Sequence, residues 1–360
     1  MILALVITTV VSLLVLEASL RLFKYALLPF VGVQHQPCIY VEDQQIGFRH
    51  RPSSTGWIHR YFEMDNVVEI NSDGFHDIER RDEQKAVTED KRKTILVVGD
   101  SFTASLHVPI PRTWTQTLER ELRDTSVVNL GLEATGTDAH LAILEKYLPE
   151  YEPDIVILAF FENDMEDIRR TKLYGDCYNG NALFYQDQEQ KEQMKLYVDE
   201  NDPSAATRWL FDRVFIFRLA SSFFSSSSDL LRNNMLFPHT IGLEFSGESA
   251  EPRNDIDQLL TDFRQLSQQW GFRLLVIPVP TRMRVNVSLE TLTENASPQV
   301  LAELEVIDIW PIFTSLRESE GAGHRSLFWK YDGHFNAKGN ELFGLSVARQ
   351  LEQLSTVESD

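Results

Sequence analysis

The sequence predicts an α/β fold built around a parallel central sheet. Between residues 94 and 280, apolar runs of about five to eight residues alternate with longer segments that have helical spacing. Strands that alternate with helices in this way are typical of βαβ units, which build parallel sheets. Polar residues follow several of the apolar runs, so they are expected at the edge where parallel strands end together. Open α/β sheets bind their ligands along that edge.

The N-terminal segment is apolar and is expected to anchor the chain in a membrane. Its first sixteen residues carry no charged side chain, and Glu17, Arg21 and Lys24 follow. A membrane span needs about 20 apolar residues, so this one is slightly short. A cleaved signal peptide is the alternative, but no Lys or Arg precedes the apolar run and no A-x-A site closes it. We therefore expect residues 1–24 to form a transmembrane anchor or signal anchor.

Residues 36–90 predict a small β-rich lead-in and a linker. Aromatic and β-branched residues alternate here with turn residues, among which Ser72-Asp73-Gly74 is a strong turn signal. The polar run from Asp82 to Lys93 predicts an exposed linker. The α/β pattern begins directly after it.

Residues 91–355 carry the α/β pattern, with an insertion at about 166–252. The expected strands are 94–99, 126–131, 154–161 and 272–280, and the expected helices are 113–124, 138–151, 255–271 and a last one near the C-terminus. The insertion contains an apolar helical stretch at 208–224 and a serine-rich tip at 225–229. Two interpretations of it stay open: a lid over the sheet edge, or an elaborated surface without a role in binding.

Composition excludes some classes of function. The chain has 360 residues, 54 of them Asp or Glu against 34 Lys or Arg, for a formal net charge of −20. Such a surface repels phosphate backbones, so we expect no nucleic-acid partner. Cys38 and Cys177 lack zinc-type spacing and form either one disulfide or two buried thiols.

The first strand ends on Gly99-Asp100-Ser101, which has two interpretations. It is either a turn with a helix cap or a nucleophilic serine held at the sheet edge. A serine hydroxyl needs an adjacent base, usually a histidine that a carboxylate orients. His334 lies two residues after Asp332, near enough for the carboxylate to set the imidazole tautomer.

A tetrahedral intermediate also needs fixed hydrogen-bond donors. Three donors follow strands of the predicted sheet: the backbone N–H of Ser101, backbone N–H groups in the turn 131–136, and the side-chain amide of Asn163. Each of these groups also has a purely structural interpretation; Asn163, for example, is also a good helix cap. His324 suggests a metal ligand, but no further ligand has useful spacing, so we expect neither metal nor cofactor. The sequence has no glycine-rich loop with a lysine, so we do not expect a phosphate-binding protein.

These motifs together resemble the SGNH (GDSL-type) hydrolase family over roughly residues 40–355. The four blocks are "GDSFT" with Ser101, "NLGLEATGT" at 129–137, Asn163-Asp164, and Asp332 with His334 in "DGHFNAKG". The lead-in "NSDGFHD" and an apolar N-terminus ending in an acidic residue and "LRLF" resemble its membrane-anchored bacterial members.

The resemblance implies a flavodoxin-like three-layer fold and ester hydrolysis without metal or cofactor. It implies Ser101 as nucleophile, His334 as general base and Asp332 as its orienting carboxylate. Ser101, Ala134 and Asn163 would supply the oxyanion hole. The sequence departs from the family at four points: Phe102 replaces a leucine, Ala134 and Phe161 replace glycines, and one residue instead of two separates Asp332 from His334.

The expected function is a serine esterase acting on short-chain or acetyl esters, with an acylated glycan as one candidate substrate. Two alternatives stay open: an O-acetyltransferase on an envelope polysaccharide that uses the same triad, and a catalytically silent binding protein of SGNH fold. The positive charges after the span weakly favour a cytoplasmic domain, whereas the family analogy favours an extracytoplasmic one, which we adopt. The sequence leaves the natural substrate and the oligomeric state open.

Overall fold

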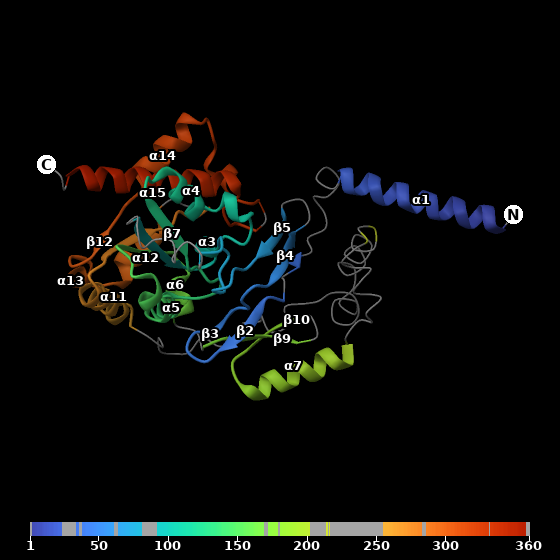
Figure 1. Cartoon of the computed structure of the whole chain (residues 1–360), viewed down its shortest axis with the longest axis horizontal. Helices are drawn as coiled ribbons and strands as arrows, with labels where there is room; N and C mark the ends of the chain where they lie inside the picture. The colour runs from blue at the N-terminus through green and yellow to red at the C-terminus, as the bar shows by residue number, and fades with distance from the viewer. Residues whose placement is uncertain are drawn as a thin grey trace.

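A computed structural model shows a central sheet enclosed by helices, with smaller β elements beside it (Figure 1). The structure describes residues 2–23, 34–35, 38–60, 64–80, 92–168, 172–178, 181–201, 214, 216, 255–282, 286–330 and 332–357.

The central sheet has five parallel strands in the order β12-β11-β8-β6-β7. Their bounds are β6 (Lys93–Gly99), β7 (Thr125–Asn129), β8 (Ile155–Phe160), β11 (Arg273–Pro278) and β12 (Glu305–Val306). The predicted α/β fold with a parallel central sheet is therefore confirmed. Each of the four predicted strands lies within two residues of its observed bounds, and β12 is an additional short edge strand.

Helices cover both faces of this sheet. The longer helices are α4 (Trp114–Glu121), α5 (Thr137–Tyr151), α11 (Ile256–Trp270), α14 (Trp310–Ser319) and α15 (Ala337–Val357). Within β6, Ile95 and Val97 pack with α4, α14 and α15, whereas Leu96 and Val98 pack with α5 and α11. Successive residues of a strand point to opposite faces, so a strand buried on both sides is continuously apolar.

Shorter helices fill the connections. They are α3 (Ser101–Ala104), η1 (Ile110–Arg112), α6 (Asp164–Asp167), α12 (Val287–Asn295), α13 (Pro298–Leu301) and η2 (His324–Leu327). The two that follow strands of the sheet directly, α3 and α6, begin at the carboxyl ends of β6 and β8. They bring residues of the first and third motifs to one edge of the sheet.

The lead-in forms two small antiparallel sheets. One contains β1 (Gln34–His35), β4 (Thr55–Arg60) and β5 (Met64–Glu69), and the other is the hairpin of β2 (Tyr40–Asp43) and β3 (Gly47–His50). Their apolar side chains join the same core as α5 and α11. The lead-in therefore packs directly on the α/β body.

The described part of the insertion packs against the lead-in. It contains the antiparallel pair β9 (Tyr174–Tyr178) and β10 (Asn181–Tyr185), followed by α7 (Gln188–Asn201). A disulfide joins Cys38 to Cys177 across 139 residues, with 5.6 Å between their Cα atoms. The predicted apolar helix at 208–224 falls, apart from residues 214 and 216, outside the described residues, as does the serine-rich tip.

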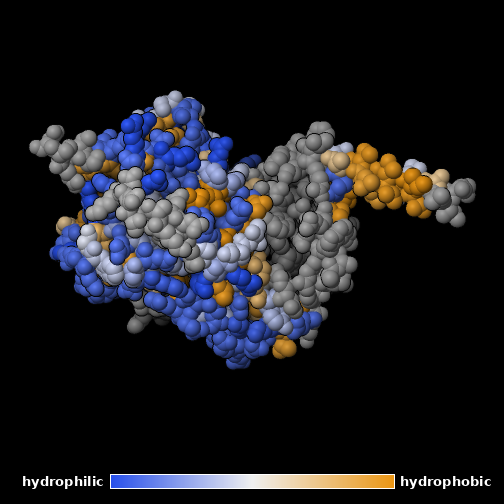
Figure 2. All heavy atoms as spheres, in the orientation of Figure 1, coloured by the Kyte–Doolittle hydropathy of each residue, from blue (hydrophilic) through white to orange (hydrophobic). Residues whose placement is uncertain are grey.

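The N-terminal segment is the helix α1 (Ile2–Phe23). Its large apolar side chains between Leu5 and Leu16 are exposed, and this helix has a hydrophobic surface in Figure 2. By length and hydropathy, however, no helix among the described residues qualifies as a membrane span. The predicted transmembrane segment is thus not confirmed.

Candidate active site

The serine of the first motif lies at a junction between strand and helix. Strand β6 ends at Gly99, and Asp100 caps α3 by accepting a hydrogen bond from the Phe102 N–H at 2.9 Å. A side chain at Gly99 would collide with Thr103, so glycine is required for α3 to turn back on the strand. The helix-cap interpretation of this motif is therefore confirmed. Ser101 is the first residue of α3, directly after the end of β6, and its role as a nucleophile stays a prediction.

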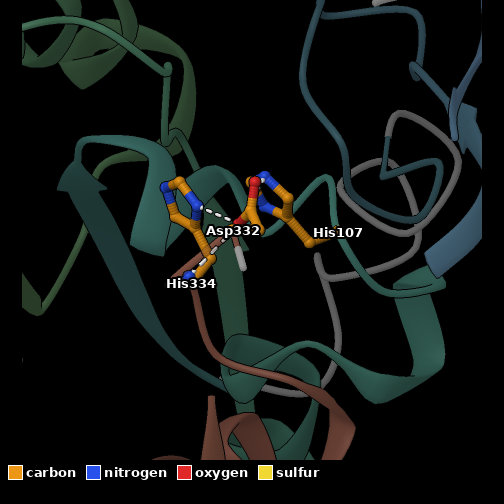
Figure 3. A group of neighbouring side chains, drawn as sticks. All are labelled: His107, Asp332 and His334. Carbon is orange, nitrogen blue, oxygen red and sulfur yellow. Dashed lines mark hydrogen bonds and ion pairs between the residues drawn. The ribbon is translucent and has the colours of Figure 1, made fainter. Parts of the chain in front are cut away.

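Ser101, His334 and Asp332 form a continuous hydrogen-bonded chain. His334 Nε2 lies 2.7 Å from Ser101 Oγ, and His334 Nδ1 lies 2.6 Å from Asp332 Oδ1. The His334 backbone N–H also donates to Asp332 Oδ1 at 3.2 Å (Figure 3). The residue between them, Gly333, has φ +97°, a conformation that favours glycine. That turn is what lets a spacing of one residue close the Asp–His contact.

The environment of the triad keeps Asp332 ionised. Burial raises the pKa of this carboxyl group, but the hydrogen bond from His334 and the nearby His107 outweigh it, so the pKa falls well below its usual range. An ionised Asp332 accepts the Nδ1–H of His334. The tautomer that results leaves Nε2 as the acceptor for the Ser101 hydroxyl.

Two buried acidic side chains, Asp100 and Asp164, lie close enough together for the charge of one to act on the other. Burial raises the pKa of Asp100 to about 6, and it raises that of Asp164 well above its usual range with the charge of Asp100 adding to the effect. Burial also lowers the pKa of His140, 3.7 Å from Asp164, to about 3. A neutral Asp164 and a neutral His140 avoid the cost of isolated buried charges.

The loops of the first three motifs meet around Ser101. The Leu132 N–H donates to the Gly99 carbonyl at 3.0 Å, and a side chain at Gly131 would collide with the backbone of Ala104. Ala134 has φ +55°, the left-handed conformation in which glycine is usual. Within the described residues, Asn163 Oδ1 is buried without a hydrogen-bond partner. The neighbourhood agrees with an oxyanion hole at Ser101, Ala134 and Asn163, which stays a prediction.

Phe161 is part of an aromatic group beside the triad. Its ring centroid lies 4.2 Å from that of Phe102, and the Phe102 ring lies 4.9 Å from the His334 ring. Phe102 is buried and Phe161 is half-buried. Two of the four positions where this sequence departs from the SGNH pattern that it resembles thus contact each other.

The sequence analysis missed His107. Its ring stacks on that of His334, with 4.0 Å between centroids and 14° between planes, and its Nε2 lies 3.6 Å from Asp332 Oδ1 (Figure 3). The three residues offer ligand atoms within 4.8 Å of one another. Imidazole lone pairs lie in the ring plane, however, so two nearly parallel stacked rings do not direct them at one metal ion. No sequence pattern marks His107, because it lies in the turn after α3.

A second missed group joins the lead-in to the second motif. Glu133, next to Ala134, accepts a hydrogen bond from the Tyr40 hydroxyl at 2.5 Å and lies 2.8 Å from His50 Nε2. Burial raises the pKa of Glu133, but the attraction and hydrogen bond of His50 and the Tyr40 hydroxyl lower it to about 2. Tyr40 and His50 both lie more than 80 residues before Glu133, so only the fold could reveal these contacts.

Comparisons with known proteins give one short sequence match and several distant folds. No protein-family model matches the chain. A curated arylesterase of Vibrio mimicus is 32% identical over 74 residues, which are 19% of this chain and 37% of the arylesterase. The match thus spans little more than a third of that protein.

The solved structures that resemble this chain are remote in sequence. A putative lipolytic protein of the G-D-S-L family from Desulfitobacterium hafniense has 13% identity and a TM-score of 0.37, covering 71% of this chain and 98% of that one. A lipase/acylhydrolase from Enterococcus faecalis has 17% identity and a TM-score of 0.34, covering 72% and 96%. A two-domain esterase active on acetylated mannans has 12% identity and a TM-score of 0.37, covering 76% and 52%.

Proposed function

We propose that this chain, an SGNH (GDSL-type) hydrolase by its motifs, cleaves acyl esters through an acyl-enzyme on Ser101. The observation that carries the proposal is the hydrogen-bonded chain from Ser101 Oγ through His334 to Asp332, with distances of 2.7 and 2.6 Å. A serine hydroxyl becomes an effective nucleophile when a base is already in hydrogen-bond contact with it.

The reaction follows from this arrangement. Ser101 Oγ attacks the ester carbonyl carbon while its proton passes to His334 Nε2, and ionised Asp332 stabilises the imidazolium that forms. His334 then returns the proton to the leaving alcohol as the ester C–O bond breaks. Water, activated by the same histidine, attacks the acyl-enzyme, releasing the carboxylic acid and restoring the serine hydroxyl.

The oxyanion hole is part of the proposal. The Ser101 and Ala134 backbone N–H groups and the Asn163 side-chain amide would donate to the oxygen that becomes negative. Removing one such donor typically costs about 100- to 1,000-fold in kcat. Support comes from the contacts between the three loops, described above.

The identity of the substrate and of the acceptor of the acyl group are further parts of this proposal. We favour a short acyl group, with an acetylated glycan as one natural substrate. Transfer of the acyl group to a sugar hydroxyl instead of water would make the protein an O-acetyltransferase with the same triad. A catalytically silent binding protein is disfavoured because all three triad side chains are present and in contact.

The test is hydrolysis of p-nitrophenyl acetate by the full chain in detergent, with Ser101→Ala and His334→Ala alongside. Each substitution should lower kcat by at least about 1,000-fold, because the triad acts as a unit. Thermal unfolding of each variant controls for loss of fold. Wild-type activity that survives in Ser101→Ala would refute the acyl-enzyme. Activity that appears only when a sugar acceptor is added would identify the transferase instead.

The cellular location is also a proposal. We propose an extracytoplasmic domain held at the membrane by residues 1–24, a location that the Cys38–Cys177 disulfide supports because such bonds persist in oxidising compartments. Cell fractionation, with thiol alkylation before lysis, tests both parts. Recovery in the cytosol with two free thiols would contradict the location.

A further inference from the structure

We propose that His107 is a positioning residue of the triad, which holds the His334 ring in the orientation that reaches both Ser101 and Asp332. This inference rests on the proposed function, because it assigns a role within the same site. The contact that carries it is the face-to-face stack of the His107 and His334 rings, 4.0 Å apart and 14° from parallel (Figure 3).

His107 is itself held firmly, which a positioning residue requires. The carbonyl of Leu106 accepts a hydrogen bond from the Asn66 side chain at 2.7 Å, and the carbonyl of Val108 lies 3.0 Å from His76 Nε2. The backbone on both sides of His107 is thus held by side chains of the lead-in. His107 is only 8% exposed, so its ring has little room to turn.

The His334 ring needs such support. Its side chain is 25% exposed, whereas that of Asp332 is 6% exposed. Two hydrogen bonds fix its nitrogens, but one of them is to the serine hydroxyl and is lost whenever Ser101 carries an acyl group. During that half of the reaction, Asp332 and the neighbouring rings alone hold the imidazole. Phe102 contacts it at a tilt of 39°, and His107 covers a face almost in parallel.

His107 also faces the carboxylate that orients the base. Its Nε2 lies 3.6 Å from Asp332 Oδ1, the oxygen that accepts the His334 Nδ1–H. The one carboxylate oxygen is therefore bordered by two imidazoles from different parts of the chain. A shift of His107 would disturb both the stacked ring and the anion beside it. Misplacement of a catalytic group by about 1 Å can cost roughly 100-fold in rate.

The experiment compares His107→Ala with His107→Phe in the full chain. His107→Ala removes the stacked ring and should lower kcat for p-nitrophenyl acetate by about 10- to 100-fold with KM changed less than about twofold. His107→Phe keeps a flat ring at this position and should recover most of the loss. Val108→Ala, a buried residue of the same turn, is the matched control for disturbance of the loop.

A second readout does not depend on turnover. The proton shared by His334 Nδ1 and Asp332 should give a low-field NMR resonance in the wild type. We expect it to be broadened or lost in His107→Ala and retained in His107→Phe. If the wild type shows this resonance but hydrolyses no ester, the proposed function fails while the positioning role is still measured.

Three results would overturn the positioning role. The first is wild-type kcat with an unchanged resonance in His107→Ala. The second is a loss in His107→Ala that Val108→Ala reproduces, which would make the residue a part of the packing only. The third is a His107→Phe variant that keeps the wild-type melting temperature but recovers neither kcat nor the low-field resonance.

Discussion

Phe161 is the side chain whose identity most directly bears on substrate size. It occupies a position where the SGNH pattern that the chain resembles has glycine. Its ring centroid lies 4.2 Å from that of Phe102, which is itself in contact with His334. If the proposed acyl-enzyme forms on Ser101, we expect its acyl chain to lie against this pair of rings. A bulky side chain in place of glycine leaves less room for long acyl chains, since packed aromatic rings yield little.

We therefore expect Phe161→Ala to shift the preference toward longer acyl chains. The ratio of kcat/KM for p-nitrophenyl octanoate to that for the acetate should rise about tenfold, because one changed hydrophobic contact is worth roughly 1–3 kcal/mol. Phe161→Leu, which keeps much of the volume, is the control and should stay near wild type. A wild-type enzyme that already prefers octanoate would refute the short-chain proposal.

At the level of single residues, the sequence pointed to candidates that lie in local patterns, and the structure brings three of them, Ser101, His334 and Asp332, into contact. Ser101, Asn163, Asp332 and His334 each lie in a motif beside an element that its residues predict. His107 could not be found, because its role depends on how a turn folds against a loop more than 200 residues away.

The lead-in acts on the active site through its hairpin. Tyr40 in β2 and His50 in β3 both bind the carboxylate of Glu133, the neighbour of Ala134. Ala134 has φ +55°, a conformation that costs a non-glycine residue about 1–2 kcal/mol. The contacts on Glu133 hold the backbone where that conformation is needed. The hairpin therefore stabilises the second motif.

This contact predicts an acid-dependent loss of stability. The pKa of Glu133 is about 2 in the folded chain and about 4.5 without its partners. A lowered pKa stabilises the fold fully above the unfolded value, and the stabilisation disappears as the pH falls from about 4.5 toward 2. The free energy of unfolding of the wild type should exceed that of Glu133→Gln by on the order of 2–3 kcal/mol at pH 7.

Urea unfolding at pH 7, 5 and 3 measures this difference. The gap between wild type and Glu133→Gln should be present at pH 7 and 5 and clearly smaller at pH 3. The matched control is Glu150→Gln, a substitution on the exposed side of α5. A gap that does not change with pH would show that the carboxylate charge does not stabilise the fold.

Helices and strands could be predicted where their hydrophobic pattern extends over enough residues. Strands β6, β8 and β11 are continuous apolar runs. Helices α5 and α11, which precede β8 and β11, have helical spacing, so the existence and order of these elements could be predicted. Strand β12 has only two residues, too few for any periodic signal, and it exists because β11 offers an edge to pair with. The pairing of β9 with β10 likewise lies in a polar stretch without strand alternation.

For the whole molecule, the disulfide determines how the accessory parts are joined. Cys38 lies two residues before β2 of the lead-in, and Cys177 lies in β9 of the insertion. Beside it, Glu42 binds Lys191 Nζ at 2.7 Å and accepts from the Tyr185 hydroxyl at 2.5 Å, so the same two parts are also joined by polar contacts. From the sequence alone, a disulfide between these two cysteines and a pair of free thiols were equally open, because only the fold brings the two residues together.

Breaking this bond should therefore destabilise the protein. Closing a loop of 139 residues in the unfolded chain is worth up to about 5 kcal/mol on entropic grounds. Cys38→Ser, Cys177→Ser and the double variant should all melt at about the same lower temperature, because each removes the same bond. Calorimetry with and without a reducing agent measures it. Reductant should lower the melting temperature of the wild type and leave the double variant unchanged. A wild type that melts identically under both conditions would show that the two thiols are not paired in solution.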